Sequence, residues 1–455
     1  MNTKVVLYRA SILHFPEATD VPSRDYVHFV DGGLVVVNGK ILALDEYAVI
    51  FPKHPTAEVV DYRGRLIVPG FLDSHLHFPQ TEMIAKYGEQ LLEWLENYTF
   101  PTEDKFKDMN YCRYIAQIFL RQLIDNGTTT ALTFASVHSQ SVDAMFEAAS
   151  QLNMAFITGK VCMDRHCPTY LQDTASSAQR QSDDLIQRWH GKGRNLYALT
   201  PRFAPTSSPE QLASLGELAQ QYPDVFIQTH LSENAHEVAW VKELYPTHTN
   251  YLDVYEHFNM VRKRSVFGHC LHLNNDEWAQ LSESGAVSAF CPSSNLFLGS
   301  GLFDIQSAKE HKVSIALASD VGAGTSFNML RNYGDAYKIS QLQQSPINPY
   351  EGLYYMTQGP AIAYDLSDNI GNLNPGSYAD FVVLTPLANE LSKLRHLGAN
   401  TTSTATSNNA DQTTVENASD MIFALSMIGD DRAVEATYIA GKQQKTPMEN
   451  LNALA

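Results

Sequence analysis

The sequence predicts an α/β protein: a closed (β/α)8 barrel of the TIM-like type with a small β-sandwich domain built from both chain ends. Between residues 66 and 319, short apolar runs alternate with longer segments of helical periodicity eight times. The runs are continuously apolar, which is typical of parallel strands that are covered on both faces. A block of about 250 residues is also the usual size of eight βα units.

Each predicted barrel strand is a short run rich in β-branched and aromatic residues. In chain order they are Leu66–Phe71, Thr128–Phe134, Ala155–Val161, Leu196–Thr200, Val225–Leu231, Ser265–Cys270, Ala286–Cys291 and Val313–Ser319. The helices predicted between them, several opened by Ser, Asp or Pro, include Tyr111–Asn126, Ser141–Leu152, Ser176–His190, Pro209–Gln221 and Asn274–Ser284. We therefore assign residues 67–370 to the barrel domain.

The two chain ends have a different, strand-rich character. Gly33–Val37 and Ile41–Leu44 flank Asn38-Gly39-Lys40, which is a strong hairpin turn signal. Asp380–Leu384 and Ala436–Lys442 have the same pattern near the other end. We expect both ends to meet in one small sheet beside the barrel.

This composite β-sandwich domain is predicted to span residues 1–66 and 371–455. Within it, residues 398–419 are rich in Asn, Thr, Ser and Ala and poor in large apolar residues. That composition predicts a mobile polar surface loop, because such a segment buries too little apolar surface to offset the entropy of ordering.

Composition narrows the function classes. Fifty acidic residues against thirty-two basic ones give a formal charge of −18, which disfavours nucleic acids and anionic membranes as partners and suits a neutral or cationic small molecule. The five cysteines include no Cys-x-x-Cys pair, so the sequence indicates neither a disulfide framework nor a thiolate zinc site. No apolar stretch approaches the ~20 residues of a membrane span. We expect a soluble protein of the reducing cytoplasm.

Polar residues end several of the predicted strands. His75 and His77 close an apolar run, and on a strand two such side chains share a face about 7 Å apart. Alone, this pair would be better explained as two ordinary surface histidines. However, His230, His269 and Asp320 end strands five, six and eight, and the carboxyl ends of barrel strands surround the reaction centre. Imidazoles and one carboxylate around a divalent ion, with a position left for water, predict a catalytic zinc site.

Glu233 lies three residues after His230 and is the candidate proton carrier. A metal lowers the pKa of its water toward ~7, but displacing an amino group also needs a residue that moves a proton to the departing nitrogen. Asp320 would accept the proton of the water. The alternative for Glu233 is a helix-capping role before Asn234–Leu244. For His269 three roles stay open: metal ligation, a hydrogen bond to the water, or polarisation of the substrate.

Four other histidines lie near the same predicted rim. Loop histidines are usually exposed to solvent or hydrogen-bonded to local backbone, so we expect no direct role for them. They are His138, His166, His236 and His272.

Several segments together resemble the amidohydrolase superfamily, in its mononuclear deaminase branch. They are Pro69–His77, His230-Leu231-Ser232-Glu233, Ala318-Ser319-Asp320 and the return segment Gly371–Phe381. Further segments are similar to the guanine deaminase family within that branch, namely Tyr87–Pro101, Gly159–Asp164, Thr200–Phe203 and Cys291–Leu296. The resemblance covers nearly the whole chain apart from the polar loop.

The resemblance implies hydrolysis of guanine to xanthine and ammonia by a homodimeric enzyme. It implies that one zinc ion is held by His75, His77, His230 and Asp320. Iron(II) accepts the same ligands. The implied catalytic residues are Glu233, Asp320 and His269, and the implied substrate-binding residues are His77, Gln80, Arg202, Phe203, His230, Glu233 and Asp320.

The implied purine contacts are chemically sensible. Arg202 is a permanent donor suited to a carbonyl oxygen, Gln80 offers a donor and an acceptor, and Phe203 offers an aromatic face. Polar groups that pair with the correct base would favour guanine over adenine. The alternative for Arg202 is a purely structural pair with a carboxylate at the rim.

Three other functions compete with guanine deamination. Another deaminase or a chlorohydrolase of the same branch is disfavoured by Arg202-Phe203 and Leu92–Leu95. A two-metal cyclic amidase needs a carboxylated lysine at the end of strand four, where Thr200-Pro201-Arg202 supplies none. A non-catalytic scaffold would have lost metal ligands that are all present in this sequence.

The Pro-Cys-x-x-Cys signature of the thiolate zinc deaminases is absent, since Cys291-Pro292 has the reverse order. We therefore expect a fold different from theirs.

Overall fold

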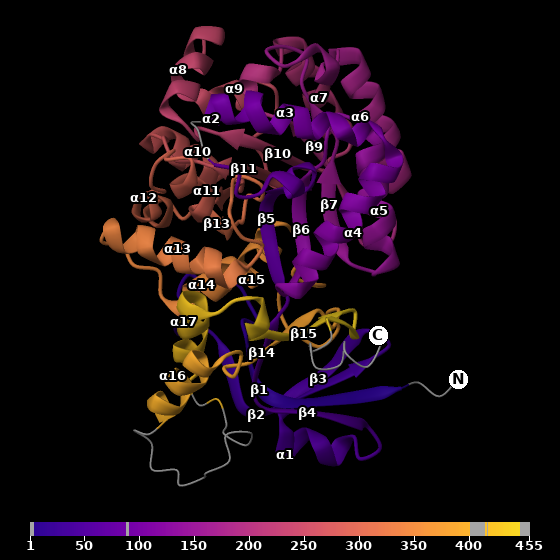
Figure 1. Ribbon diagram of the computed structural model, residues 1–455, viewed down its shortest axis with the longest axis vertical. Coiled ribbons are helices and arrows are strands. Elements are labelled where there is room, and N and C mark those ends of the chain that lie inside the picture. Colours follow the sequence, from indigo (N-terminus) through magenta and orange to yellow (C-terminus); the bar gives the residue numbers. More distant parts are fainter. Residues whose placement is uncertain (1–3, 88–90, 401–414, 416, 446–455) are drawn as a thin grey trace.

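Eight parallel strands form a barrel in the computed structural model, which describes residues 4–87, 91–400, 415 and 417–445 (Figure 1). Their order in the sheet is β13-β12-β11-β10-β9-β7-β6-β5, and the short β8 (Val161–Cys162) pairs with β9. The strands are β5 Phe71–His77, β6 Thr128–Phe134, β7 Ala155–Gly159, β9 Asn195–Pro201, β10 Phe226–Leu231, β11 Ser265–His269, β12 Val287–Phe290 and β13 Ser314–Leu317. The predicted (β/α)8 barrel is confirmed.

The barrel closes where its last strand meets its first. The backbone N–H of Asp320, just after β13, donates to the carbonyl oxygen of His75 in β5 at 2.8 Å. One residue earlier, the N–H of Ser319 donates to Oδ1 of the buried Asp73 at 3.0 Å. These bonds fix the register of β5 against the end of β13.

Helices cover the barrel and pack their apolar stripes against its strands (Figure 1). They are α2 Leu91–Trp94, α3 Phe100–Glu103, α4 Met109–Asp125, α5 Ser139–Gln151, α6 Ala175–Trp189, α7 Pro209–Gln221, α8 Ala235–Leu244, α9 Tyr251–His257, α10 Asn275–Ser284, α11 Pro292–Phe297, α12 Ile305–Glu310, α13 Met329–Leu342, α14 Pro349–Tyr355 and α15 Gln358–Ala363. The helix predicted at Pro209–Gln221 is α7 and has the same bounds, because Ser208 caps it and Pro209 occupies its first turn.

The first predicted barrel strand, Leu66–Phe71, was placed wrongly. Leu66–Pro69 ends β4 (Glu58–Pro69) of the second sheet, and the barrel strand begins at Phe71. The chain passes from one sheet to the other at Gly70, where an added Cβ would lie 2.1 Å from Oγ1 of Thr129. A continuous apolar run does not reveal this break, because both strands it joins are buried on both faces.

Seven strands from both chain ends form the second sheet, in the order β16-β15-β14-β4-β1-β2-β3. Besides β4 they are β1 Val5–His14, β2 Val27–Val37, β3 Lys40–Glu46, β14 Phe381–Leu384, β15 Val434–Ile439 and β16 Lys442–Lys445. The short helix α1 (Tyr47–Ile50) follows β3. The small domain built from both chain ends is thereby confirmed as part of the fold.

The predicted hairpin turn joins β2 to β3. Asn38 and Gly39 both have left-handed backbone conformations, with φ of 51° and 78°, as a two-residue turn between twisted strands requires. An added Cβ on Gly39 would lie 2.7 Å from the carbonyl oxygen of Ala440, so this turn also packs on the C-terminal hairpin.

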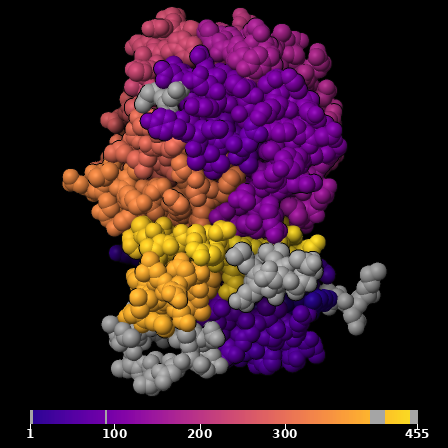
Figure 2. Space-filling model, in the orientation of Figure 1, coloured from indigo at the N-terminus to yellow at the C-terminus, as the bar shows by residue number. Residues whose placement is uncertain are grey.

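The second sheet is buried on both faces at its centre, whereas its edge strands β3 and β16 are partly exposed. Alternate residues of β14 divide between two clusters: Val382 and Leu384 join the main core under the barrel, whereas Phe381 and Val383 face a separate apolar cluster with Tyr438. In Figure 2 the yellow C-terminal residues lie across the waist between the barrel and the indigo N-terminal strands. The domain limits at residues 66/67 and 370/371 stay predictions.

The segment predicted as a polar loop, residues 398–419, is helical at both of its ends. Residues 398–400 belong to α16 (Glu390–Asn400), and residues 418 and 419 begin α17 (Ala418–Ile428). Residues 401–414 and 416, the rest of that prediction apart from the buried Val415 and the helix-capping Asn417, lie outside the described residues. Within the described part of the chain, every helix is too short or too polar to cross a lipid bilayer.

A buried ion pair joins the barrel to the second sheet and provides a test of this packing. Arg194, before β9, donates to both carboxylate oxygens of Asp380, before β14, and their side chains are 6% and 2% exposed. Asp380→Asn leaves the guanidinium unpaired in a buried place, so we expect the free energy of unfolding to fall by about 3 kcal/mol. Urea unfolding measures it. A change as small as that of the control Asp61→Asn, which removes the carboxylate of an exposed arginine pair, would contradict this account.

Candidate metal centre

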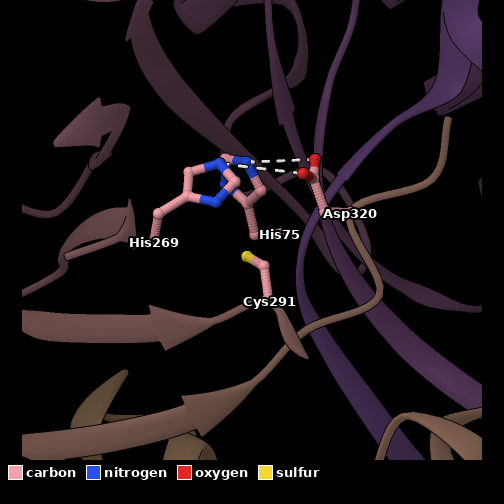
Figure 3. Close-up of side chains that lie close together, drawn as sticks. All are labelled: His75, His269, Cys291 and Asp320. Carbon is pink, nitrogen blue, oxygen red and sulfur yellow. Dashed lines mark ion pairs between the residues drawn. The ribbon is translucent and has the colours of Figure 1, made fainter. Parts of the chain in front are cut away.

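Five predicted site residues converge at the carboxyl end of the barrel. They are His75 and His77 from β5, His230 from β10, His269 from β11 and Asp320 after β13. All are buried, with at most 8% of any residue exposed. Figure 3 shows the rings of His75 and His269 beside the Asp320 carboxylate. The structure therefore brings together side chains that are far apart in the sequence.

The distances between the inward atoms match the demands of one ion. Nε2 of His77 lies 3.2 Å from Nε2 of His230 and 3.3 Å from Oδ1 of Asp320, and Nε2 of His75 lies 3.5 Å from the same oxygen. Ligands that sit roughly 2.0–2.1 Å from a tetrahedral zinc ion are about 3.3 Å from one another. The residues present thus fit a small divalent cation.

Hydrogen bonds fix the orientation of two of the rings. Nδ1 of His230 donates to the carbonyl oxygen of Arg202 at 2.6 Å, and Nδ1 of His269 donates to Oδ1 of Asn295 at 2.8 Å. The bond of His230 places the proton on Nδ1 and leaves the lone pair of Nε2 directed to the centre, whereas the bond of His269 fixes a ring whose Nε2 faces the carboxylates of Glu233 and Asp320. Such outer partners are the usual means of holding a ligating imidazole in one tautomer.

Several buried ring nitrogens lack a partner among the described residues. They are both nitrogens of His75, Nδ1 of His77 and Nε2 of His269. Buried polar atoms nearly always have a partner, since leaving one unpaired costs about 1–3 kcal/mol. A cation at the centre would satisfy the inward-facing nitrogens.

Cys291 is a site neighbour that the sequence interpretation missed. Its sulfur, His75, His269 and Asp320 each contribute an atom to a group whose members lie within 4.8 Å of one another, and this group shares His75 with the His75–His77–His230 group (Figure 3). The thiol donates to the carbonyl oxygen of Ala289 at 3.3 Å, and burial raises its pKa well above the usual value. It is therefore a protonated neighbour beneath the ring of His75.

The electrostatic environment favours the ligand forms of these groups. Burial, and after it the neighbouring histidines, hold the pKa of His75 and His230 well below the usual value, and burial lowers the pKa of His77 despite Asp320. Burial raises the pKa of Asp320, but the hydrogen bond with His77 and the nearby imidazoles outweigh it and lower the result. Neutral imidazoles and an ionised carboxylate are what metal binding requires.

Glu233 points into the centre instead of capping the helix after it. The capping box of α8 is formed by Asn234 and Glu237, so the capping alternative for Glu233 is wrong. Its carboxylate lies 3.4 Å from Nε2 of His269 and accepts from Ser300 Oγ at 3.4 Å. Nε2 of His269 also lies 3.7 Å from Asp320, which places His269 between the two carboxylates.

The protonation of Glu233 and His269 is linked through this contact. Burial raises the pKa of Glu233 to about 7, and the charges of Asp320 and Glu237 add to the rise against the opposing effect of His269. Burial lowers the pKa of His269, but Glu233 and Asp320 outweigh it and the result is raised. A carboxyl group whose pKa lies near neutrality is suited to take up and release a proton in catalysis.

The three residues predicted to hold a ring lie beside the metal centre. Gln80 is 3% exposed, Arg202 is 2% exposed, and Phe203 is 4% exposed within an apolar cluster that includes Trp94 and Leu298. The guanidinium of Arg202 is close enough to lower the pKa of all three predicted metal-binding histidines. It also donates to both oxygens of the buried Glu103, at 2.9 and 3.0 Å, as the structural alternative foresaw.

The remaining rim histidines stay outside the metal group among the described residues. His166 Nδ1 bonds the carbonyl oxygen of Pro205 and His272 Nε2 that of Ser300, His236 is exposed, and His138 precedes α5. The first three have the local or solvent environment expected of them, whereas Nε2 of His138 is buried without a hydrogen-bond partner among the described residues.

Two of the strand ends carry backbone strain. His269 and Asp320 have φ of 74° and 50°, in the left-handed region that residues with a side chain rarely adopt. Such conformations cost of order 1–3 kcal/mol each and gather at functional sites, where the surrounding structure enforces them. The strain turns both side chains toward the centre instead of along the strand.

Comparison with known proteins agrees with this geometry. The model of the Amidohydrolase family matches residues 66–443. The chain belongs to that family. It is 48% identical over 438 residues to a protein named guanine deaminase from Escherichia coli (strain K12), with 95% of this chain and 96% of that protein covered.

Solved structures give the same result for the fold. The structure named E. coli guanine deaminase superposes with a TM-score of 0.91 at 47% identity and covers 97% of this chain and 99% of that one. A guanine deaminase from C. acetobutylicum, solved with bound guanine in the active site, superposes with a TM-score of 0.85 at 25% identity over 97% of this chain and 100% of that one. The superfamily resemblance seen in the sequence is confirmed.

Sequence reasoning missed Glu103 and Cys291 for different reasons. Glu103 directly follows Phe100-Pro101-Thr102, and a carboxylate in a short apolar helix is a signal of a buried partner. Cys291 ends a predicted strand just as the ligands do, but a lone thiol gave no indication of a neighbouring imidazole.

The space occupied by the His75 ring yields a test of the centre. An added Cβ on Gly268 would lie 2.6 Å from Cε1 and 2.9 Å from both nitrogens of this ring. Gly268→Ala should therefore displace His75 and weaken metal binding at least ~10-fold, a usual cost of disturbing a metal site. Metal content after dialysis measures it. The matched control is Gly352→Ala in α14, whose Cβ would lie 2.3 Å from the Tyr333 ring of α13. Equal metal retention by both variants would contradict the assignment.

Proposed function

We propose that this chain is a guanine deaminase that hydrolyses guanine to xanthine and ammonia with one divalent metal ion. The observation that carries the proposal is the complete convergence of the ligand set in a chain 48% identical to a named guanine deaminase over 95% of its length. Fold similarity alone would not support a substrate, because one barrel architecture hosts many reactions.

The metal would be held by His75, His77, His230 and Asp320. Three imidazoles and one carboxylate suit zinc best, although iron(II) accepts the same donors. When bound, the ion lowers the pKa of a water molecule toward ~7 and so supplies the nucleophile. The end of β9, Thr200-Pro201-Arg202, offers no lysine for a second bridged metal, which favours one ion per chain.

Two carboxylates divide the proton transfer. Asp320, ionised beside the histidines, accepts the proton of the attacking water. Glu233, with a pKa of about 7, carries a proton to the departing amino nitrogen. His269 keeps Nε2 between these two groups, at 3.4 and 3.7 Å, and holds their relative positions through its bond to Asn295.

The surroundings position the ring and exclude bulk water. Phe203 offers an aromatic face, and Gln80 and Arg202 offer hydrogen-bonding groups beside the histidines. Because the whole centre is buried, each of these interactions acts in a medium of low polarity and is correspondingly stronger. A cytoplasmic location and a homodimer stay predictions; all five cysteines are free thiols, which agrees with a reducing compartment.

Replacing the proton carrier tests the mechanism. Glu233→Gln keeps the shape and removes the titrating group, so we expect retained metal and a turnover of guanine at least ~10²-fold lower. Steady-state kinetics on metal-assayed protein measures it, with the exposed Glu243→Gln on α8 as the control. Turnover near the unmodified rate in Glu233→Gln would remove this role.

Metal removal and a nucleobase panel test the activity itself. Chelation should abolish ammonia release from guanine, and reloading to about one zinc per chain should restore it, since the ion supplies the nucleophile. Ammonia release and metal content are measured on the same sample with guanine, adenine, cytosine and a pterin. Zinc-loaded protein that leaves guanine unchanged but deaminates another heterocycle would overturn the substrate assignment.

A further inference from the structure

Glu103 is a buried carboxylate that binds two of the predicted purine-binding side chains at once. It ends α3 and is 0% exposed. Nε2 of Gln80 donates to its Oε1 at 3.2 Å, and Nη1 of Arg202 donates to the same oxygen at 2.9 Å. The shared oxygen places the amide of Gln80 and the guanidinium of Arg202 side by side.

This contact decides which end of the Gln80 amide faces a ligand. An ionised carboxylate only accepts hydrogen bonds, so the amide must turn its NH2 group toward Glu103. The carbonyl oxygen then faces the other way, and no described residue donates to it. An added Cβ on Gly322 would lie 2.8 Å from Cβ of Gln80, so the close packing of this loop also restrains the side chain.

The same carboxylate orients Arg202. Both Glu103 oxygens accept from Nη1, at 2.9 and 3.0 Å, which leaves Nε and Nη2 as the further donors of the guanidinium. Arg202 cannot rotate freely, because its Cζ also lies 5.6 Å from the centre of the Phe100 ring. The pair therefore presents an acceptor, Oε1 of Gln80, next to a donor from Arg202.

We propose that Glu103 is the positioning residue that sets the purine specificity of the site, by fixing Gln80 as an acceptor beside Arg202 as a donor. This pattern complements a ring N–H next to a ring carbonyl, the lactam edge of guanine, xanthine and hypoxanthine. Adenine presents the opposite order, a bare ring nitrogen next to an amino group. The proposal rests on the proposed function and explains how the site distinguishes these two edges.

A neutral residue in place of Glu103 would no longer fix Gln80 as an acceptor beside Arg202 as a donor. In Glu103→Gln the new amide can donate as well as accept, so the Gln80 amide can turn over and present its NH2 group instead. The bond to Arg202 would also change from an ion pair to a weaker contact. The site would then accept the two purine edges more equally.

Hypoxanthine and adenine make the sharpest pair of probes, because they differ only at the edge in question. Binding of each to zinc-loaded protein is measured by calorimetry, with metal content and unfolding midpoint recorded. We expect the preference of the wild type for hypoxanthine to fall about 10- to 100-fold in Glu103→Gln, with one metal per chain retained. For guanine turnover, KM should rise more than kcat falls, since Glu103 does not contact the reacting atoms.

Two further variants separate specificity from stability. Asp380→Asn removes the carboxylate of another buried arginine pair and should lower stability with the purine preference unchanged. Glu103→Asp keeps the charge and should retain more of the preference for hypoxanthine than Glu103→Gln does. Its preference should still lie below that of the wild type, because the side chain is one methylene shorter. If Glu103→Gln fails to fold, this comparison of Glu103→Asp with the wild type tests the proposal.

The results that overturn the proposal are distinct from those that overturn the function. The role of Glu103 is contradicted if metal-loaded Glu103→Gln keeps the hypoxanthine preference of the wild type. It is also contradicted if the wild type binds hypoxanthine and adenine equally. A wild type that prefers hypoxanthine but leaves guanine unreacted would instead contradict the deaminase assignment. The two failures are therefore read from different measurements on the same protein.

Discussion

The seam between the first and last barrel strands is the constraint on which the centre depends. The bond from the Asp320 N–H to the His75 carbonyl closes the barrel, and the same two residues supply predicted ligands. Closing the sheet therefore sets the separation of two metal-binding side chains without any loop between them. A barrel that failed to close would separate these two side chains, so the proposed metal site depends on the closure of the fold through this contact.

The rest of the centre follows from how each inward group is held. His230 is oriented by the backbone of Arg202, His269 by Asn295, and Asp320 by a left-handed backbone. Each of these restraints acts on the part of the residue that faces away from the centre, so the atom that faces the centre stays available. Sites built on rigid strands in this way keep their geometry better than sites on loops.

The sequence was sufficient to predict the barrel, and to pick out the side chains that gather at its carboxyl end, because both depend on local patterns. Apolar runs and the polar residues that end them can be read without knowing which strands are neighbours, and His230 and Asp320 were found in this way. The error at Leu66–Phe71 has the same origin, since one uninterrupted run contained a change of sheet at Gly70.

What local patterns could not supply was pairing between distant residues. The residues around Glu103 do not indicate that its partner is Arg202, which lies 99 residues away. They also do not decide between a purine contact and a structural pair for that arginine. The structure shows the structural pair, which uses one nitrogen of the guanidinium, and leaves the other nitrogens for the predicted purine contact. The thiol of Cys291 was missed likewise, because only the fold places it under the ring of His75.

The Glu103–Arg202 pair also answers an electrostatic question that the ligand set raises. A guanidinium that lowers the pKa of three ligating histidines would oppose the binding of a cation if it stood alone. The buried carboxylate makes the pair neutral overall, so the donor needed for a carbonyl oxygen can lie near a divalent ion. Buried ion pairs seldom add net stability, because the desolvation of both charges offsets their attraction. The presence of this one therefore points to the arrangement of the site rather than to the stability of the fold as its purpose.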